Sequence, residues 1–303
     1  MRVGVIGGPR QETNPLLVGA WCAAGINALL LSPEEAPWRL EAGDVALIRL
    51  DVRQTLDGIE PGLRLLQPLT RRGIRVLNRP DALIGAHDKL ETARRLRAAG
   101  VPHPRWAHVT ASESPLGLEP PVVVKPRFGS WGREVFLCES ERELSRCLES
   151  VRLNAWFLEH GALVQELVSR TTHDLRLIVA GRQVVGAARR DAAPGEWRTN
   201  VSLGGSLAHA DPDRAAVALA VRAVAAIGMD LAGVDLLQLP EGGHVVLELN
   251  GAVDFDGRYS LRGGDAFLDA AAALDLRPGG QTEMSATSAP ESVSRSLVRS
   301  LTD

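Results

Sequence analysis

Two carboxylates and one carboxamide near the end of the chain are side chains of the kind that bind a divalent cation: Asp235, Glu248 and Asn250. They lie on two apolar segments, residues 231–239 and 244–250, which are rich in Val and Leu. The four residues between these segments include one Pro and two Gly, a composition typical of a turn between strands. The sequence therefore predicts a β-hairpin that carries all three side chains.

The register of this hairpin decides whether the three side chains meet. If the loop closes symmetrically about residues 241–242, Asp235 falls opposite Glu248, with Cβ atoms roughly 5 Å apart. Asn250 is two residues beyond Glu248, so both lie on the same face of their strand. Gly233 is expected opposite Asn250, where it leaves room for a bound group.

Two carboxylates held this close repel each other unless one is protonated or a cation lies between them. Oxygen donors suit Mg²⁺, which takes one or two carboxylates and completes its shell with substrate phosphates. We therefore predict that Asp235, Glu248 and Asn250 hold Mg²⁺, with Mn²⁺ as an alternative ion. On this interpretation Asp235→Asn and Glu248→Gln spare folding. The competing interpretation is a different register that turns the acids to solvent.

A second element upstream has the features of an anion site. Residues 122–124 are three Val that predict a short buried strand, and Lys125 ends it. Because burying an unpaired ammonium is costly, Lys125 should meet an anion. Residues 129–133 contain two Gly, one Ser and one Arg, so backbone N–H groups and a positive charge can face a phosphate. An ordinary solvent-exposed turn is the alternative, and the segment does not match the P-loop pattern GxxxxGK[ST].

Taken in order, these motifs resemble those of the ATP-grasp superfamily. The most similar branch contains the glutamate ligases that modify ribosomal protein S6 or cofactor side chains, and the carrier-protein ligases of lysine and arginine biosynthesis. The resemblance runs from about residue 1 to about residue 276. The motifs that carry it are Lys125, GSWGR at 129–133, VQEL at 164–167, DLR at 174–176, RTN at 198–200, Asp235 and ELN at 248–250.

The resemblance implies an α/β chain with an ATP-grasp fold. The first 86 residues alternate between short apolar strands and helices, which predicts a parallel α/β domain, and the resemblance makes this the N-terminal pre-ATP-grasp domain, 1–86. A small lobe with a phosphate flap, 87–166, and a large lobe with the metal site, 167–276, would follow. Residues 277–303 are rich in Ser, Thr, Gly and Pro and predict a disordered tail.

The resemblance also implies the residues that bind ATP. Lys89 and Lys125 are expected to contact the phosphates, and the flap from Gly129 to Arg133 would close over them. The hinge Gln165–Leu167 would hold adenine by backbone groups, and Asp174 would contact the ribose. The full nucleotide set is Lys89, Lys125, Gly129, Ser130, Trp131, Gly132, Arg133, Gln165, Glu166, Leu167, Asp174 and Thr199.

The activity implied is an ATP-dependent carboxylate–amine ligase that passes through an acyl phosphate and releases ADP and phosphate. Arg176, Arg198 and Asn200 would lie near the γ-phosphate and the acyl group. Arg176, Arg189 and Arg198 would pair with an acidic substrate, glutamate or a similar amino acid. A carrier-protein-dependent ligase of the lysine and arginine type is one alternative. A carboxylase-like or regulatory nucleotide-binding protein is the other.

Composition limits the partners. The chain has 303 residues, 45% of them hydrophobic and 23% charged, with a formal net charge of −3. This charge gives no general field for nucleic acid. The sequence has no apolar run of about 18 residues, and it opens on a strand pattern, so we expect a cytoplasmic protein without membrane contact. The expected partners are a small carboxylate and an amine, or an acidic carrier protein; a homo-oligomer, dimer or tetramer, is left open.

Overall fold

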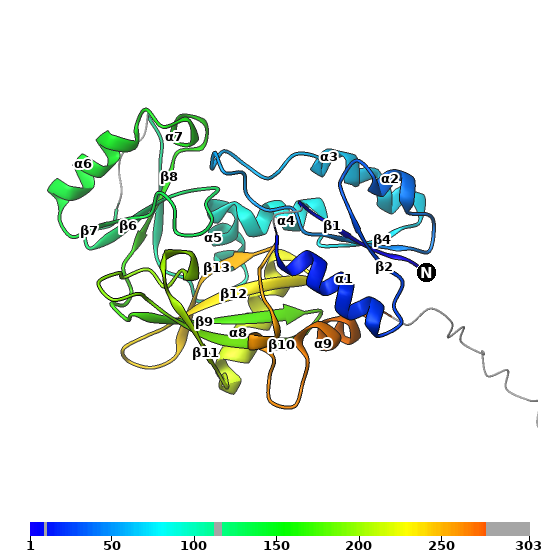
Figure 1. Cartoon of the computed structure of the whole chain (residues 1–303). Coiled ribbons are helices and arrows are strands. Elements are labelled where there is room, and N and C mark those ends of the chain that lie inside the picture. Colours follow the sequence, from blue (N-terminus) through cyan, green and yellow to red (C-terminus); the bar gives the residue numbers. More distant parts are fainter. Residues whose placement is uncertain (9–10, 112–116, 277–303) are drawn as a thin grey trace, which may run out of the picture.

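The computed structural model describes residues 1–8, 11–111 and 117–276, arranged around three β-sheets (Figure 1). The tail predicted for residues 277–303 lies outside the described residues. None of the described helices is both long and apolar enough to cross a membrane.

The N-terminal sheet forms from short Val-, Leu- and Ile-rich segments that alternate with helices. All its strand pairs are parallel, in the order β2-β1-β3-β4, and β1 and β3 are buried along their whole length, as expected for a sheet covered on both faces. Its elements are β1 (Val3–Ile6), α1 (Thr13–Ala23), β2 (Ala28–Leu31), α2 (Ala36–Arg39), β3 (Val45–Ile48), α3 (Leu63–Leu66), η1 (Gln67–Arg72), β4 (Arg75–Leu77) and α4 (Pro80–His87).

The second sheet is antiparallel, in the order β5-β8-β6-β7, and it carries Lys125 near the end of β6. The strand predicted for residues 122–125 is confirmed, with one further residue at its end. The elements are β5 (Trp106–Val109), β6 (Val122–Pro126), β7 (Phe136–Cys138), α6 (Glu141–Val151), α7 (Ala155–His160) and β8 (Ala162–Glu166).

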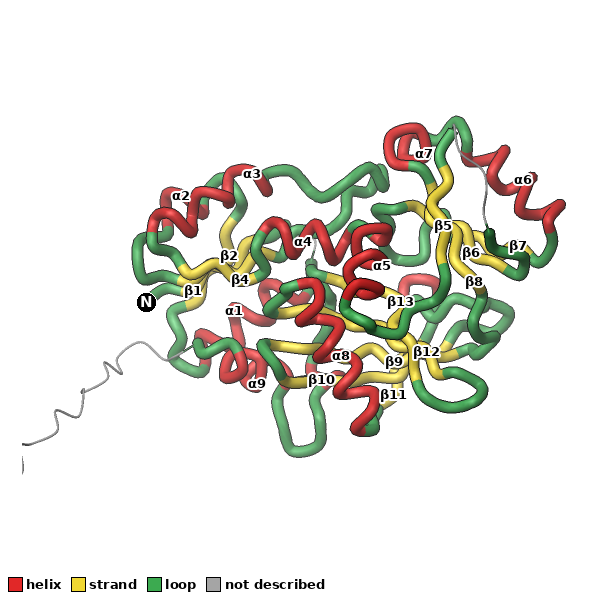
Figure 2. Tube along the Cα trace, turned by 180° about the vertical axis from the view of Figure 1, so that it is seen from behind, coloured by secondary structure: helices red, strands yellow, loops and turns green. Residues whose placement is uncertain are grey.

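The third sheet holds the predicted acidic hairpin at its edge, in the order β11-β10-β9-β12-β13. Helices α5 and α8 pack on this sheet from behind (Figure 2). The elements of this part are α5 (Lys89–Ala98), β9 (His173–Ala180), β10 (Gln183–Asp191), η2 (Val201–Leu203), β11 (Ser206–His209), α8 (Arg214–Ile227), β12 (Leu231–Gln238), β13 (His244–Asn250), η3 (Gly257–Tyr259) and α9 (Ala266–Ala273). Helix α5 packs on α8 and β13. The first residues of the predicted small lobe therefore pack against this third, five-stranded sheet, called the large sheet below.

The hairpin has the predicted register at its functional end, but for a different reason. Asp235 pairs with Glu248, and Gly233 pairs with Asn250, as predicted. At the tip, however, Gln238 pairs with His244, so the turn is not symmetric about residues 241–242. An irregularity between Asp235 and Leu236 adds one residue to β13 and restores the expected pairing. A β-bulge therefore sets the face on which Glu248 lies.

Candidate active site

A row of charged residues crosses the large sheet on three neighbouring strands. Asp235 on β12 is the register partner of Arg176 on β9 on one side and of Glu248 on β13 on the other. Directly opposed residues on adjacent antiparallel strands have neighbouring side chains. The strand order therefore brings Arg176 next to two carboxylates that belong to one hairpin farther along the chain.

Asp235 is the centre of a buried ion-pair network. It is 1% exposed, and it accepts hydrogen bonds of 2.7 and 2.8 Å from Nε and Nη2 of Arg176. Arg190 on β10 donates to it at 2.7 Å and also binds Asp174 at 2.7 and 2.5 Å. Burial alone would raise the pKa of Asp235, but the two guanidinium groups hold this pKa well below its usual range. Asp235 is thus ionised at neutral pH.

The network also includes two residues that were predicted to contact the nucleotide. Asp174 is 2% exposed, and besides Arg190 it binds the Thr199 hydroxyl, which donates to it at 2.5 Å. Asp174 and Thr199 also line a cavity of about 350 Å³. Their contact with a ribose remains a prediction.

The three predicted metal ligands offer oxygen donors, the kind that a hard divalent cation takes. An ionised carboxylate has about four acceptor positions, and the arginines occupy three of those on Asp235. Glu248 contacts the ammonium of Lys89 at 3.4 Å, and Asn250 Oδ1 accepts one bond, from Ala252 N–H at 3.0 Å. Among the described residues, no three His, Cys, Asp or Glu side chains could hold a metal by themselves. An ion bound here would therefore depend on phosphate oxygens as further ligands.

Lys125 is buried beside a neutral acceptor. It is 6% exposed, its Nζ donates to Gln165 Oε1 at 2.6 Å, and no carboxylate of the described residues lies within ion-pair distance of it. Burial, assisted by Lys89, lowers the pKa of Lys125 to about 8, against the opposing effect of Glu248. The anion expected for Lys125 is thus not supplied by the part of the chain that the structure describes.

This pKa predicts a pH dependence of nucleotide binding. Lys125 carries its charge below about pH 8 and loses it above, so the affinity for Mg-ATP should fall as the pH rises through 8, by up to about tenfold per pH unit. Calorimetric titration on both sides of pH 8 measures the effect. Lys125→Met should bind more weakly and show no such change. An affinity of the unmodified protein that stays constant across this interval would contradict the assignment of Lys125 to the phosphates.

The flap is held closed through its backbone carbonyl groups. Lys89 Nζ donates to Gly129 O at 2.5 Å, Arg198 Nη1 donates to Gly132 O at 2.8 Å, and the Ser202 hydroxyl donates to Trp131 O at 3.2 Å. Lys89 itself is positioned by its neighbour Asp88, which caps α5 by accepting two backbone N–H bonds. The flap, which connects β6 and β7 of the second sheet, is therefore tied to the segment that follows β10.

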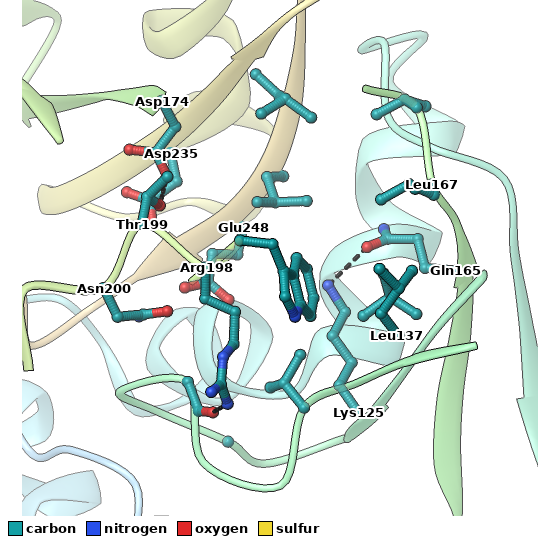
Figure 3. Close-up of a pocket in the computed structure, with 18 of the residues that line it drawn as sticks. Lys125, Leu137, Gln165, Leu167, Asp174, Arg198, Thr199, Asn200, Asp235 and Glu248 are labelled. Carbon is teal, nitrogen blue, oxygen red and sulfur yellow. Dashed lines mark hydrogen bonds between the residues drawn. The ribbon is translucent and has the colours of Figure 1, made fainter. Parts of the chain in front are cut away.

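Two cavities meet beneath the flap, with volumes of about 350 Å³ and about 340 Å³. The two cavities are adjacent, because seven residues line both of them: Lys89, Gly129, Ser130, Trp131, Arg190, Asn200 and Glu248. In the first cavity, Asp174, Thr199 and Asp235 lie on one wall, and Lys125, Gln165 and Leu137 lie across from them (Figure 3). The first cavity thus has acidic and basic walls that face each other.

Most of the predicted site residues line the first cavity. They are Lys89, Lys125, Gly129, Ser130, Trp131, Gly132, Gln165, Glu166, Leu167, Asp174, Arg198, Thr199, Asn200, Asp235 and Glu248. Arg176 and Asn250 line only the second cavity. Arg133 lines neither cavity and instead donates to Gln54 O of the N-terminal domain at 3.2 Å, so its expected contact with the phosphates is not supported by its position.

The cations expected to pair with an acidic substrate already have partners. Arg198 binds Glu196, and Arg189 binds Asp191 at 3.1 Å and lines neither cavity. Arg190, the residue after Arg189 on β10, is 3% exposed and lines both cavities. The apolar composition of residues 184–188 just before it was the available sequence signal, and residues 185–188 are buried.

Comparison with known proteins agrees with this geometry. Residues 87–267 match the sequence profile of the RimK-like ATP-grasp domain. The chain is 31% identical over 193 residues to the glutamate–LysW ligase ArgX of Sulfurisphaera tokodaii, which covers 62% of this chain and 68% of that protein. It is 30% identical over 252 residues to N-acetylaspartylglutamate synthase A of Homo sapiens, covering 79% of this chain and 62% of that protein.

A solved structure gives the same result. The RimK domain ATP-grasp protein of Sphaerobacter thermophilus superposes with a TM-score of 0.64 at 25% identity, and the match covers 90% of this chain and 99% of that protein.

Proposed function

Because the chain belongs to the RimK-like ATP-grasp family, we propose that it is an ATP-dependent carboxylate–amine ligase that releases ADP and phosphate. One observation carries the proposal: the first cavity has cationic and anionic side chains on facing walls, suited to a metal-bound triphosphate, and a second cavity of similar size lies against it and shares seven of its lining residues. Such a pair of adjacent cavities suits the transfer of a phosphoryl group to a second substrate.

The reaction takes two steps. An oxygen of the substrate carboxylate attacks the γ-phosphorus of ATP, the bond from that phosphorus to the β,γ-bridging oxygen breaks, and ADP leaves an acyl phosphate behind. The amine nitrogen then attacks the acyl carbon to form the C–N bond. Collapse of the tetrahedral intermediate breaks the bond to phosphate, which carries away the amine proton as HPO₄²⁻. Without activation, the carboxylate would have to expel oxide.

The residues of the first cavity act on this reaction electrostatically. Lys89 and Lys125 contact the phosphates and offset the charge that moves toward ADP. Asp235, Glu248 and Asn250 would hold Mg²⁺, which would neutralise charge on the phosphate oxygens. The closed flap excludes water, which would otherwise hydrolyse the acyl phosphate.

One reactant is an acidic amino acid, with glutamate as the first choice. The names of both relatives above contain glutamate as a substrate or a product unit. The second reactant is a small metabolite or, by analogy with the LysW ligase, an acidic carrier protein.

The test is a screen of the purified protein with Mg-ATP against amino acids and carboxylates, with ADP, AMP and phosphate measured together. ADP and phosphate should appear in equal amounts, and only when a carboxylate and an amine are both present. Glutamate should support the reaction better than neutral amino acids. AMP as the main product would end the proposal, and activity with neutral amino acids but not with glutamate would refute the substrate assignment.

A further inference from the structure

Tyr259, the only tyrosine in the chain, lines the second cavity at the end of η3. It is 4% exposed, yet its hydroxyl makes no hydrogen bond to any residue that the structure describes. The hydroxyl oxygen is not among the buried atoms of the described residues that lack a partner, so it keeps some accessible surface although the residue as a whole is buried. Because Tyr259 lines the cavity, a ligand bound there could accept a hydrogen bond from this hydroxyl.

Two guanidinium groups near Tyr259 each keep one unused nitrogen. Arg176 and Arg190 bind the two aspartates of the network through Nε and Nη2. Neither Nη1 has a partner among the described residues. Both arginines line the second cavity, and both interact electrostatically with the Tyr259 phenol. The three residues that carry these hydrogen-bond donors thus line the same cavity.

We propose that the Tyr259 hydroxyl and the Nη1 groups of Arg176 and Arg190 form a donor cluster that binds the carboxylate to be phosphorylated. The same donors would stabilise the oxyanion when the amine attacks the acyl carbon, which makes Tyr259 a catalytic residue. This inference rests on the proposed ligase function and names the part of the site that holds its acid substrate.

The position of the donor cluster distinguishes a carboxylate from the γ-phosphate of ATP. Tyr259 and Arg176 do not line the first cavity, whereas Arg190 lines both. Tyr259 and Arg176 therefore belong to the second cavity, and Arg190 belongs to the wall that both cavities share, beside which a carboxylate must lie to attack the γ-phosphorus. Aspartates already balance the charges of both arginines. The cluster would hold its ligand chiefly by directed hydrogen bonds, which strengthen as charge develops on the oxygen.

The phenol is in the right state to donate. Burial raises the pKa of Tyr259, and the neighbouring arginines do not reverse this effect, so the proton stays on the hydroxyl at neutral pH. The backbone around it is fixed by a bridge between Ser260 and Gly186 of β10. A Cβ at Gly186 would lie 3.0 Å from the backbone carbonyl oxygen of Tyr259. A glycine at this position therefore permits the close approach of η3 to β10.

The first test needs no turnover. Biosynthetic 3-fluorotyrosine places one ¹⁹F resonance at Tyr259, because the chain has no other tyrosine. With Mg²⁺ and a non-hydrolysable ATP analogue present, L-glutamate, L-aspartate, glutarate and acetate are titrated separately. A saturable shift with at least one carboxylate supports the donor cluster, even if that carboxylate fails to release ADP in the ligase assay, a result that would count only against the proposed function. A shift with the nucleotide analogue alone, and none with any carboxylate, would overturn the inference in favour of the γ-phosphate, and no shift at all would also overturn it.

The second test is Tyr259→Phe, which removes the hydroxyl and keeps the ring. We expect kcat/KM for the carboxylate to fall about 10²-fold, as for loss of one oxyanion donor, with the Kd for Mg-ATP unchanged within about twofold. The matched control is Ser260→Ala, which removes a neighbouring hydroxyl that accepts a bond from Ala266 N–H and does not line the cavity. Equal kcat/KM values for the two variants would contradict the role of Tyr259.

Discussion

Glu248→Gln should lower turnover by about 10³-fold, the equivalent of roughly 4 kcal/mol of transition-state stabilisation. The substitution keeps the shape of the side chain but removes the charge that a metal ion and Lys89 both need. Because the Glu248 side chain is 27% exposed, the variant should fold normally. ADP release and the thermal unfolding midpoint, measured together, decide the matter.

The control for this substitution lies in the same hairpin. Glu241→Gln makes the same chemical change at an exposed position of the turn, outside both cavities, and should leave turnover unchanged. If Glu248→Gln and Glu241→Gln are equally active, the hairpin does not hold a catalytic cation.

Asp235→Asn should destabilise the fold by about 3–5 kcal/mol, because it leaves the Arg176 guanidinium without a counter-charge and removes one of the two carboxylates that pair with Arg190. The sequence alone predicts that this substitution spares folding, and the structure corrects that expectation: Asp235 is the shared partner of Arg176 and Arg190. Urea denaturation at neutral pH gives the free energy of unfolding.

Asp191→Asn is the matched control for this prediction. It makes the same change on β10, where Asp191 pairs with a half-exposed Arg189, and an exposed pair contributes at most about 1 kcal/mol. Equal losses of stability in the two variants would show that the buried network is not what holds these strands together.

The sequence predicted the hairpin and the fold because their signals are local or carried by motif order. Runs of Val and Leu around a Pro-Gly turn define β12 and β13 to within one residue, and the predicted ATP-grasp fold is confirmed by the family match and the superposed structure. The bulge in β13 was not predictable, since nothing in the alternation of side chains marks which residue is left unpaired. The predicted pairing of Asp235 with Glu248 was right only because the bulge compensates for a turn whose centre was predicted incorrectly.

The partners of the site residues depend on strand order, which a single sequence does not specify. Arg176 meets Asp235 because β9 and β12 are neighbours, although 59 residues separate them in the chain. Gln165 meets Lys125 because β8 pairs with β6. Tyr259 has no periodic signal, because it lies in the three-residue 3-10 helix η3, which packs against β10, β11 and α9.

The way the flap is held has a consequence for sequence drift within the family. Its anchors end on the carbonyl oxygens of Gly129, Trp131 and Gly132, atoms that every amino acid possesses. Substitutions at Ser130 or Trp131 can therefore accumulate without loss of the hydrogen bonds that hold the flap. Related chains could in this way change the side chains that the flap presents to a ligand and keep the same closed backbone. Gly132 is the exception, because its φ of +70° lies in the left-handed region, where any other side chain would be strained.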